Sequence, residues 1–322
     1  MTQYRSFSDA FNAELRALIR HGTPAEAIVD PGSPASDFGH RPRESLERIG
    51  MAFSTLSVVD NIGTCTQIPF NLTYGVGLFL WSIAGSDDLD TITYYRAARP
   101  KGKKISFGQR MLRADGKHDL MQLALKRLNL DPGSRRAYLP IFSTSDLFED
   151  GEIPCAIGFH LHQRGGALHA VTIMRAQNAT TAWPMDYFLF SSFLRFAAAT
   201  AGLAEGTYTQ LNSTFHAFRE DIDRLKGDLQ SGLVQTQAFG LGSMINLPGE
   251  IDKLIKFEAQ LRFAVGSQRL PEVLELVNQD RHFESDAGKT IARILISIAL
   301  KRLGASPWSH PLLELQLSAL IR

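Results

Sequence analysis

The chain of 322 residues has only two cysteines, Cys65 and Cys155. Two cysteines cannot make a disulfide framework, so we expect a protein of a reducing compartment, the cytoplasm. The N-terminus lacks the apolar core of a signal peptide, because Phe7, Phe11 and Leu15 share one face of a predicted helix that charged residues interrupt. Long uncharged apolar runs are also missing, which predicts that no segment spans a membrane.

Neither sign of charge is in excess: 34 Lys and Arg residues face 33 Asp and Glu residues, for a formal net charge of +1. This balance argues against a broad nucleic-acid-binding surface, so we expect no nucleic-acid partner. Glycine-rich phosphate loops, dinucleotide fingerprints and paired-cysteine motifs are absent. His160 and His162 alternate along a predicted strand, but no cysteine or acidic set completes a site around them, so we expect no bound metal.

The hydrophobic pattern predicts an α+β fold, in which helices pack on a mixed β-sheet, with a helical C-terminal extension. We expect residues 1–265 to form the catalytic domain and residues 266–322 to pack on it as helices. Residues 23–43 are rich in Pro, Gly, Ser and Asp and indicate a long loop. Helices are predicted at 73–84, 119–128, 187–201, 271–277, 287–303 and 311–321. Strands are predicted at 51–59, 137–142, 155–162 and 168–174.

Several short motifs occur in an order and at spacings that resemble the thymidylate synthase superfamily. They are Asp131-Pro132-Gly133-Ser134-Arg135-Arg136, Pro154-Cys155, Met174-Arg175-Ala176-Gln177-Asn178, Trp183-Pro184-Met185-Asp186 and Phe215-His216-Ala217-Phe218. A looser match lies upstream, where Leu80-Trp81 belongs to a predicted buried helix and Arg41, Ser45 and Glu47 resemble a phosphate-loop signature. The resemblance leaves out the helical C-terminus.

The resemblance implies that Cys155 is a covalent nucleophile. A pyrimidine is a poor nucleophile at C5 until a thiolate adds at C6, and sulfur adds readily and reversibly. The activated C5 then takes up a one-carbon unit from 5,10-methylenetetrahydrofolate, which the resemblance implies as co-substrate. Without the resemblance, Cys155 is more simply interpreted as a small buried core residue.

The arginines would bind the nucleotide phosphate, which needs several charge-assisted donors. The resemblance implies that Arg175 and Arg41 act in the same subunit as Cys155, with Arg43 as the alternative to Arg41. Arg135 and Arg136 would reach in from the partner of a homodimer. Taken alone, these two arginines are equally typical of a solvated turn beside a helix end.

Asp186 bears on the identity of the base. Thymidylate synthases carry Asn at the matching position, where an amide pairs with uracil. A carboxylate accepts instead from the N4 amino group and a protonated N3 of cytosine, a pattern that resembles the deoxycytidylate hydroxymethylases. The alternative is that Asp186 only caps a helix beginning at Tyr187.

Departures from the family pattern refine this hypothesis. Ala176 and Phe218 replace residues with hydroxyls near phosphate and sugar, which favours a ribonucleotide. Asn178 replaces an Asp associated with the folate. Leu78 stands where the family has a proton-relaying Glu, so Asp87, Asp88 or water would take that part. We expect His216 and Ala176 to contact the nucleotide, and Asn178 and Trp183 to contact the folate.

Three functions follow from these observations. The first is a 5-hydroxymethylase acting on CMP or dCMP, which would supply a modified nucleoside for an antibiotic or for phage-type DNA. The second is a pyrimidine nucleotide C5-methylase, which Asp186 and the Leu-Ile-Arg C-terminus disfavour. The third is a catalytically silent relative that binds nucleotide or RNA, which Leu78 and Asn178 favour and Cys155 opposes.

Overall fold

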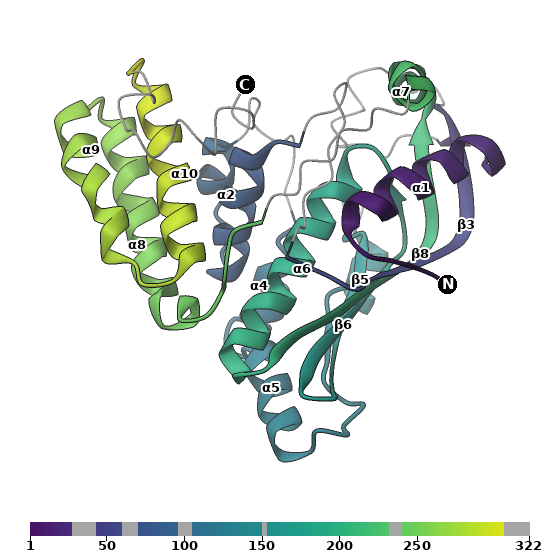
Figure 1. Cartoon of the computed structure of the whole chain (residues 1–322), viewed down its shortest axis with the longest axis horizontal. Helices are drawn as coiled ribbons and strands as arrows, with labels where there is room; N and C mark the ends of the chain where they lie inside the picture. The colour runs from purple at the N-terminus through teal and green to yellow at the C-terminus, as the bar shows by residue number, and fades with distance from the viewer. Residues whose placement is uncertain (28–42, 60–69, 96–104, 150–152, 232–239, 306–322) are drawn as a thin grey trace.

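A computed structural model describes residues 1–27, 43–59, 70–95, 105–149, 153–231 and 240–305. One sheet of eight strands forms its centre, and helices pack against it (Figure 1). The strands are β1 (Thr2–Tyr4), β2 (Thr23–Ala27), β3 (Arg43–Thr55), β4 (Tyr138–Pro140), β5 (Ala156–Arg164), β6 (Ala167–Met174), β7 (Gln177–Asn178) and β8 (Ala204–Phe218). Their order is β1-β3-β8-β6-β5-β4, with β2 paired to β3 and β7 to β8.

The sheet is mixed, which confirms the predicted α+β class. β8 pairs antiparallel with β3 and parallel with β6, while β5 and β6 form the predicted antiparallel hairpin. β8 is the longest strand and was not predicted as a strand, although its last residues belong to one of the motifs. It places residues from two distant parts of the chain, β3 and β6, on either side of itself.

The helices before residue 232 are α1 (Phe7–His21), α2 (Leu72–Ile83), α3 (Leu89–Tyr94), α4 (Phe107–Leu112), α5 (Leu120–Leu130), α6 (Ala182–Ala201) and α7 (Arg219–Ser231), with a short 3-10 turn, η2 (Thr144–Phe148). α6 contacts β6 and β8 and is buried almost all round, which agrees with the prediction of a central helix. α6 ends where Gly202 adopts a left-handed conformation at φ 65°. α1 lies on the same face, because Phe7 stacks on Tyr187 of α6 at 3.9 Å between ring centroids.

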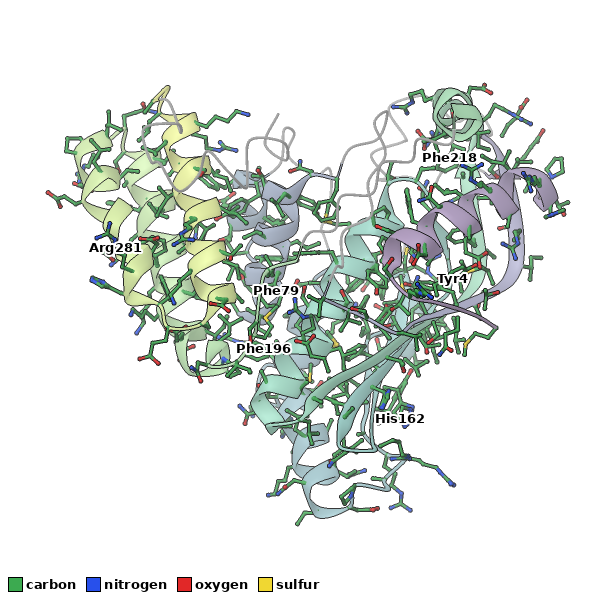
Figure 2. The ribbon with its side chains drawn as sticks, viewed as in Figure 1. Tyr4, Phe79, His162, Phe196, Phe218 and Arg281 are labelled. Carbon is green, nitrogen blue, oxygen red and sulfur yellow. The ribbon has the colours of Figure 1, made fainter. Side chains whose placement is uncertain are left out.

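The opposite face of the sheet is partly exposed. His160 and His162 of β5, His169 of β6 and Leu211 of β8 alternate with fully buried neighbours. Figure 2 shows His162 beyond the strands, on the side that α5 and α6 do not occupy. No described helix covers this part of the sheet.

The C-terminal helices are α8 (Leu247–Gly266), α9 (Leu270–Leu276), the 3-10 helix η3 (Val277–His282) and α10 (Asp286–Arg302). α10 packs between α8 and α2, at the side of the molecule away from the sheet (Figure 1). α8 was not predicted, and the expected boundary at residue 265 falls at its end. Arg195 of α6, only 1% exposed, donates to Glu205 at 3.0 Å and to the carbonyl of Gly242, joining the sheet to the segment that enters α8.

The helix predicted at 187–201 begins earlier, at Ala182. Two boundaries nearer the N-terminus also differ from the prediction. Residues 23–27 form β2 instead of the start of a loop, because they pair with β3. The strand predicted at 51–59 begins at Arg43 and ends at Thr55. The rest of the predicted loop, with Arg41, and the helix predicted at 311–321 lie outside the described residues.

Candidate active site

Strand direction brings the predicted site residues to one end of the sheet. β5 begins there, β6 and β8 end there, and β3 begins there. Cys155 directly precedes β5, Arg175 directly follows β6, and His216 lies near the end of β8. β7 extends the same edge, since Asn178 pairs with His216. The order and direction of the strands therefore bring residues that are far apart in the sequence to one region.

Cys155 is half-buried against the core. Its carbonyl accepts a hydrogen bond from the backbone N–H of Arg175 at 2.8 Å. The Arg175 guanidinium donates to the carbonyls of Pro154 at 2.9 Å and Ile153 at 3.1 Å. Arg175 thus holds the segment that presents the thiol, a role that the sequence did not predict, and it brings positive charge beside that segment. Cys65 lies outside the described residues.

Asp186 is not a helix cap, so the alternative interpretation is wrong. α6 begins at Ala182 after the N-cap position Thr181, which places Asp186 in the second turn. There its Oδ2 accepts a hydrogen bond of 2.9 Å from the side-chain amide of Gln177, a residue that is 1% exposed. Gln177 was not identified from sequence, because it occupies the open position of its motif and nothing local links it to residue 186.

The other nucleotide-binding candidates lie around this end. Ala176 is half-buried between Arg175 and Gln177. Burial lowers the pKa of His216, with the Glu47 charge opposing the shift, so its imidazole is neutral at pH 7. The Arg43 guanidinium lies 3.6 Å from the centroid of the Phe218 ring and pairs with Glu220 at 3.4 Å. Arg43 therefore stands at the site edge as the alternative to Arg41.

Of the two residues predicted to contact folate, Trp183 is fully buried and Asn178 is half-buried. Trp183 is 0% exposed and its indole is enclosed by aromatic rings, among them Phe53 at 5.2 Å and Phe215 at 4.9 Å. An enclosed indole has no face on which a pterin could stack, so Trp183 is a core residue in this conformation. The Asn178 side-chain oxygen accepts from the backbone and hydroxyl groups of Thr180 and Thr181. Asn178 therefore fixes the turn that begins α6.

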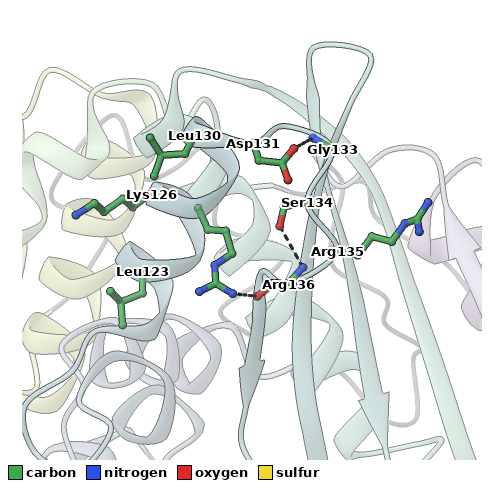
Figure 3. A pocket seen from close by; sticks show the side chains of 9 residues that line it. Leu123, Lys126, Leu130, Asp131, Gly133, Ser134, Arg135 and Arg136 are labelled. Carbon is green, nitrogen blue, oxygen red and sulfur yellow. Dashed lines mark hydrogen bonds between the residues drawn. The ribbon is translucent and has the colours of Figure 1, made fainter.

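Arg135 and Arg136 lie far from Cys155 of their own chain. The Ala137 carbonyl accepts from the Leu161 N–H, so Arg136 lies near His162 of β5. Seven residues at ~3.3 Å each separate that point from Cys155, roughly 23 Å and beyond the reach of an arginine side chain. Both arginines are exposed and line an open pocket of about 900 Å³ beside α5. In Figure 3 the Arg135 side chain points away from Lys126 and Leu123 of α5.

The family's proton-relaying carboxylate has no direct substitute at Leu78, which is 6% exposed in α2. Asp88 caps α3 by accepting from Asp90 and Thr91, and these bonds hold the pKa of its carboxyl below the usual value. Asp87 is exposed beside it. Over the described residues, no three His, Cys, Asp or Glu side chains are grouped as metal ligands, and the His160–His162 pair is not completed.

Comparison with known proteins decides the family. The sequence profile of the family "Thymidylate synthase" matches residues 77–243, half of the chain. This chain belongs to the thymidylate synthase family. A protein of Methanococcoides burtonii is 28% identical over 127 residues, 38% of this chain and 57% of its own length. A thymidylate synthase of Symbiobacterium thermophilum is 28% identical over 167 residues, 46% of this chain and 59% of its own.

A solved structure supports the fold. The thermostable thymidylate synthase A from Bacillus subtilis aligns with a TM-score of 0.55 at 18% identity, covering 71% of this chain and 84% of that one. The chain spans a little over half the length of the curated relatives it matches. Thymidylate synthases bind a pyrimidine nucleotide and use methylenetetrahydrofolate as co-substrate. Among the described helices, none is both long and apolar enough to cross a membrane.

Proposed function

We propose that this protein is a cytidine 5′-monophosphate 5-hydroxymethylase, with CMP preferred over dCMP. Methylenetetrahydrofolate is the one-carbon donor, and the new carbon–carbon bond forms at C5 of the base. The observation that supports cytosine is the Asp186 carboxylate, which lies in the second turn of α6 and is bonded to a buried amide, not used as a helix cap. A carboxylate in this place suits a base that offers two donors.

In the proposed reaction the Cys155 thiolate adds to C6, and the electron pair of the C5–C6 double bond makes C5 nucleophilic. C5 takes the methylene group, tetrahydrofolate leaves, and a proton is lost from C5 to give an exocyclic methylene. Water adds to that methylene as Cys155 is expelled from C6, which leaves a hydroxymethyl group. Arg175 contributes by holding the carbonyls before Cys155, so that the thiol is presented in one position.

The choice of base follows from donor and acceptor matching. Cytosine offers its N4 amino group and, once C6 is saturated, a readily protonated N3, and a carboxylate accepts from both. Uracil would place its O4 acceptor against the same charge, and a buried clash of acceptors typically costs about 1–3 kcal/mol. This difference corresponds to roughly tenfold to a hundredfold in selectivity.

The preference for a ribonucleotide rests on two missing hydroxyls. Ala176 is half-buried beside Arg175, and the Phe218 ring is covered by the Arg43 guanidinium. Loss of a serine hydroxyl and a tyrosine hydroxyl leaves room for the 2′-OH of ribose. A site that merely has room discriminates weakly, so the expected preference for CMP over dCMP is small. Comparison of kcat/KM for the two nucleotides tests it.

We also propose a homodimer in which Arg135 and Arg136 bind the phosphate in the partner's site. Their separation from Cys155 of the same chain supports this, and so does the partly exposed sheet face that no described helix covers. Mixing an Arg135→Ala subunit with a Cys155→Ser subunit should restore partial activity, because one hybrid site keeps both residues. If mixed dimers form without any recovery, the sites are not shared.

A C5-methylase is the second candidate, because the relative from Symbiobacterium thermophilum is named a thymidylate synthase. One experiment separates the two. The protein is incubated with methylenetetrahydrofolate and each of CMP, dCMP, UMP and dUMP, and the products are weighed. A gain of one CH2O on CMP supports the hydroxymethylase, a gain of one CH2 supports the methylase, and no change with retained binding indicates a silent relative.

A further inference from the structure

A connected group of buried polar side chains lies behind Asp186. Gln177 is 1% exposed, Gln210 is 0% exposed and Asn212 is 3% exposed. Gln210 and Asn212 lie on the helix-covered face of β8, and Gln177 begins β7. Buried amides cost free energy unless their donors and acceptors are paired. Three of them in contact at one place therefore require a specific arrangement.

The carboxylate at one end sets the direction of every hydrogen bond. An ionised carboxylate only accepts, so Gln177 must direct its Nε2 to Asp186, at 2.9 Å. Its Oε1 then accepts from Gln210 Nε2 at 2.8 Å, and the same nitrogen donates to Asn212 Oδ1 at 2.8 Å. The remaining oxygen of Gln210 accepts from the Tyr208 hydroxyl at 3.3 Å. With Asp186 ionised, the network determines the orientation of each of these amides.

The donors in this chain all point toward Asp186, from Tyr208 through Gln210 to Gln177. We call these three residues the amide relay. Aligned hydrogen bonds polarise one another and favour the ionised form of the group on which they converge. Burial, with the Asp186 charge as a smaller cause, raises the pKa of Tyr208 well above its ordinary value, so its proton remains in place. The Tyr208 hydroxyl has a single proton, and Thr172 Oγ1 at 3.0 Å lies within its reach as well as Gln210 Oε1 at 3.3 Å.

We propose that Gln177 is a positioning residue for base recognition: with Gln210 and Tyr208 behind it, Gln177 keeps Asp186 ionised and holds its carboxylate in one plane. This inference rests on the proposed function, in which Asp186 reads the base. Gln177 fills the variable position of its motif, so the family pattern does not assign it a task. A site with a fixed anion favours a base that presents two hydrogen-bond donors and disfavours a base that presents an acceptor.

The first test is Gln177→Leu, which removes the donor at similar volume. The readout is exchange of the C5 proton of the base with solvent in the absence of folate, because this exchange needs addition of the thiol at C6, after which N3 of cytosine is readily protonated. We expect the ratio of kcat/KM for this exchange, CMP over UMP, to fall about tenfold. We also expect the acid limb of kcat/KM for CMP against pH to move up by about one pH unit, since the carboxylate has lost a donor. Gln122→Leu, the same change at an exposed position of α5, is the matched control and should change neither quantity.

A second variant guards against a folding defect. Gln177→Glu is nearly isosteric but places a carboxyl beside Asp186, and two carboxyls in contact hold one proton between them. Its acid limb should move further than that of Gln177→Leu, with exchange on CMP recovering at high pH. A merely structural role for Gln177 would change the melting temperature and leave the pH profile in place.

The effect should also depend on Asp186. In an Asp186→Asn background, adding Gln177→Leu should leave the ratio of exchange rates unchanged, because there is no longer a carboxylate to hold. Additive effects, or an unchanged ratio and pH profile in folded Gln177→Leu, would overturn the inference. Exchange is measured without folate, so a protein that exchanges CMP selectively but fails to hydroxymethylate it would contradict only the proposed function. Equal exchange on CMP and UMP by the wild type would overturn both.

Discussion

Two buried polar clusters in this protein are balanced in different ways. Between α3 and α8, Glu258 accepts from the Tyr95 hydroxyl at 2.7 Å and from Arg262 at 3.0 Å, so a full positive charge faces the carboxylate. At the sheet, the amide relay reaches Asp186 through neutral amides and a hydroxyl. In the ion pair, the Arg262 charge neutralises the Glu258 carboxylate, and the pair stabilises the packing of its elements. In the amide relay, neutral dipoles stabilise the Asp186 anion and leave its charge available to a ligand.

The contrast extends to where the clusters lie. Glu258 belongs to α8, beyond residues 77–243 that match the family, while Tyr95 lies within them. The Glu258 cluster therefore attaches the C-terminal helices to the family fold. Burial and the Glu258 charge raise the pKa of Tyr95 well above its ordinary value, which keeps the donor protonated. The amide relay lies wholly within the matched part, close to the end of the sheet that carries Cys155.

The largest effect expected at the Cys155 end of the sheet is from Cys155→Ser. An alcohol is far too weakly ionised to add at C6, so turnover should fall by at least about a thousandfold while nucleotide binding and melting temperature are kept. Product formation and calorimetric binding are the measurements. Cys65→Ser is the control and should leave turnover nearly intact. A variant that retains a substantial part of the rate would rule out the covalent mechanism.

At the other cluster we expect a loss of stability without a change in specificity. Glu258→Ala removes the buried acceptor of Tyr95 and leaves the half-buried Arg262 without this carboxylate. The free energy of unfolding should fall by about 3 kcal/mol, measured by denaturant titration. Glu272→Ala, which breaks an exposed pair with Arg269, should cost less than about 1 kcal/mol. A shift in the CMP to UMP ratio with Glu258→Ala would erase the contrast between the clusters.

Asp186→Asn should produce the complementary result. An amide can rotate to donate to O4 and accept from N3–H of uracil, so activity on UMP should appear and the ratio of kcat/KM for CMP and UMP should fall roughly tenfold to a hundredfold. Because an amide can also turn to suit cytosine, the specificity should relax and not invert. The melting temperature should change little. An unchanged ratio in a folded variant would remove the main support for cytosine.

The partly exposed sheet face adds a smaller, pH-dependent effect. Burial, and then the nearby His160, Arg164 and His169, lower the pKa of His162 to about 4. The folded state therefore prefers neutral His162, and its contribution is complete above the ordinary pKa of 6.5 and is lost as pH falls toward 4. We expect a lower melting temperature at pH 5 than at pH 7, with His162→Phe removing roughly 2 °C of that difference. His118→Gln, at an exposed histidine, is the control and should leave this difference in melting temperature unchanged. If both variants reduce the difference equally, His162 has no specific role.

Much of the fold could be predicted because the relevant signals are local. Helices with one apolar face or buried all round, such as α1, α2 and α6, and the β5–β6 hairpin were identified from periodicity and turn residues. β8 was missed because its buried positions include Gln210 and Asn212 and so do not alternate cleanly between apolar and polar. α8 was missed as well, and residue 266, where the predicted C-terminal extension starts, is the last residue of that helix.

For the candidate site, too, some features could be predicted from the sequence and others could not. Motif order predicted that Cys155, Arg175 and Asp186 belong to one site, and the chemistry of a thiol, a guanidinium and a carboxylate followed from residue type. Their partners depended on the third dimension. Strand pairing places Arg175 against the carbonyls before Cys155. It also places Arg136 near His162, seven residues along the chain from Cys155. The enclosure of Trp183 by phenylalanine rings likewise depends on tertiary packing.

By itself, the sequence determined the family, the α+β class and the residue types at the candidate site, because each of these is written in local pattern and motif spacing. Only the tertiary structure decided that Asp186 lies inside α6, and that Gln177, Gln210 and Tyr208 stand behind it. The physical reason is that a buried hydrogen bond joins residues by their place in space. β7 and β8 bring together side chains that are up to 33 positions apart in the chain, and no local pattern encodes that meeting.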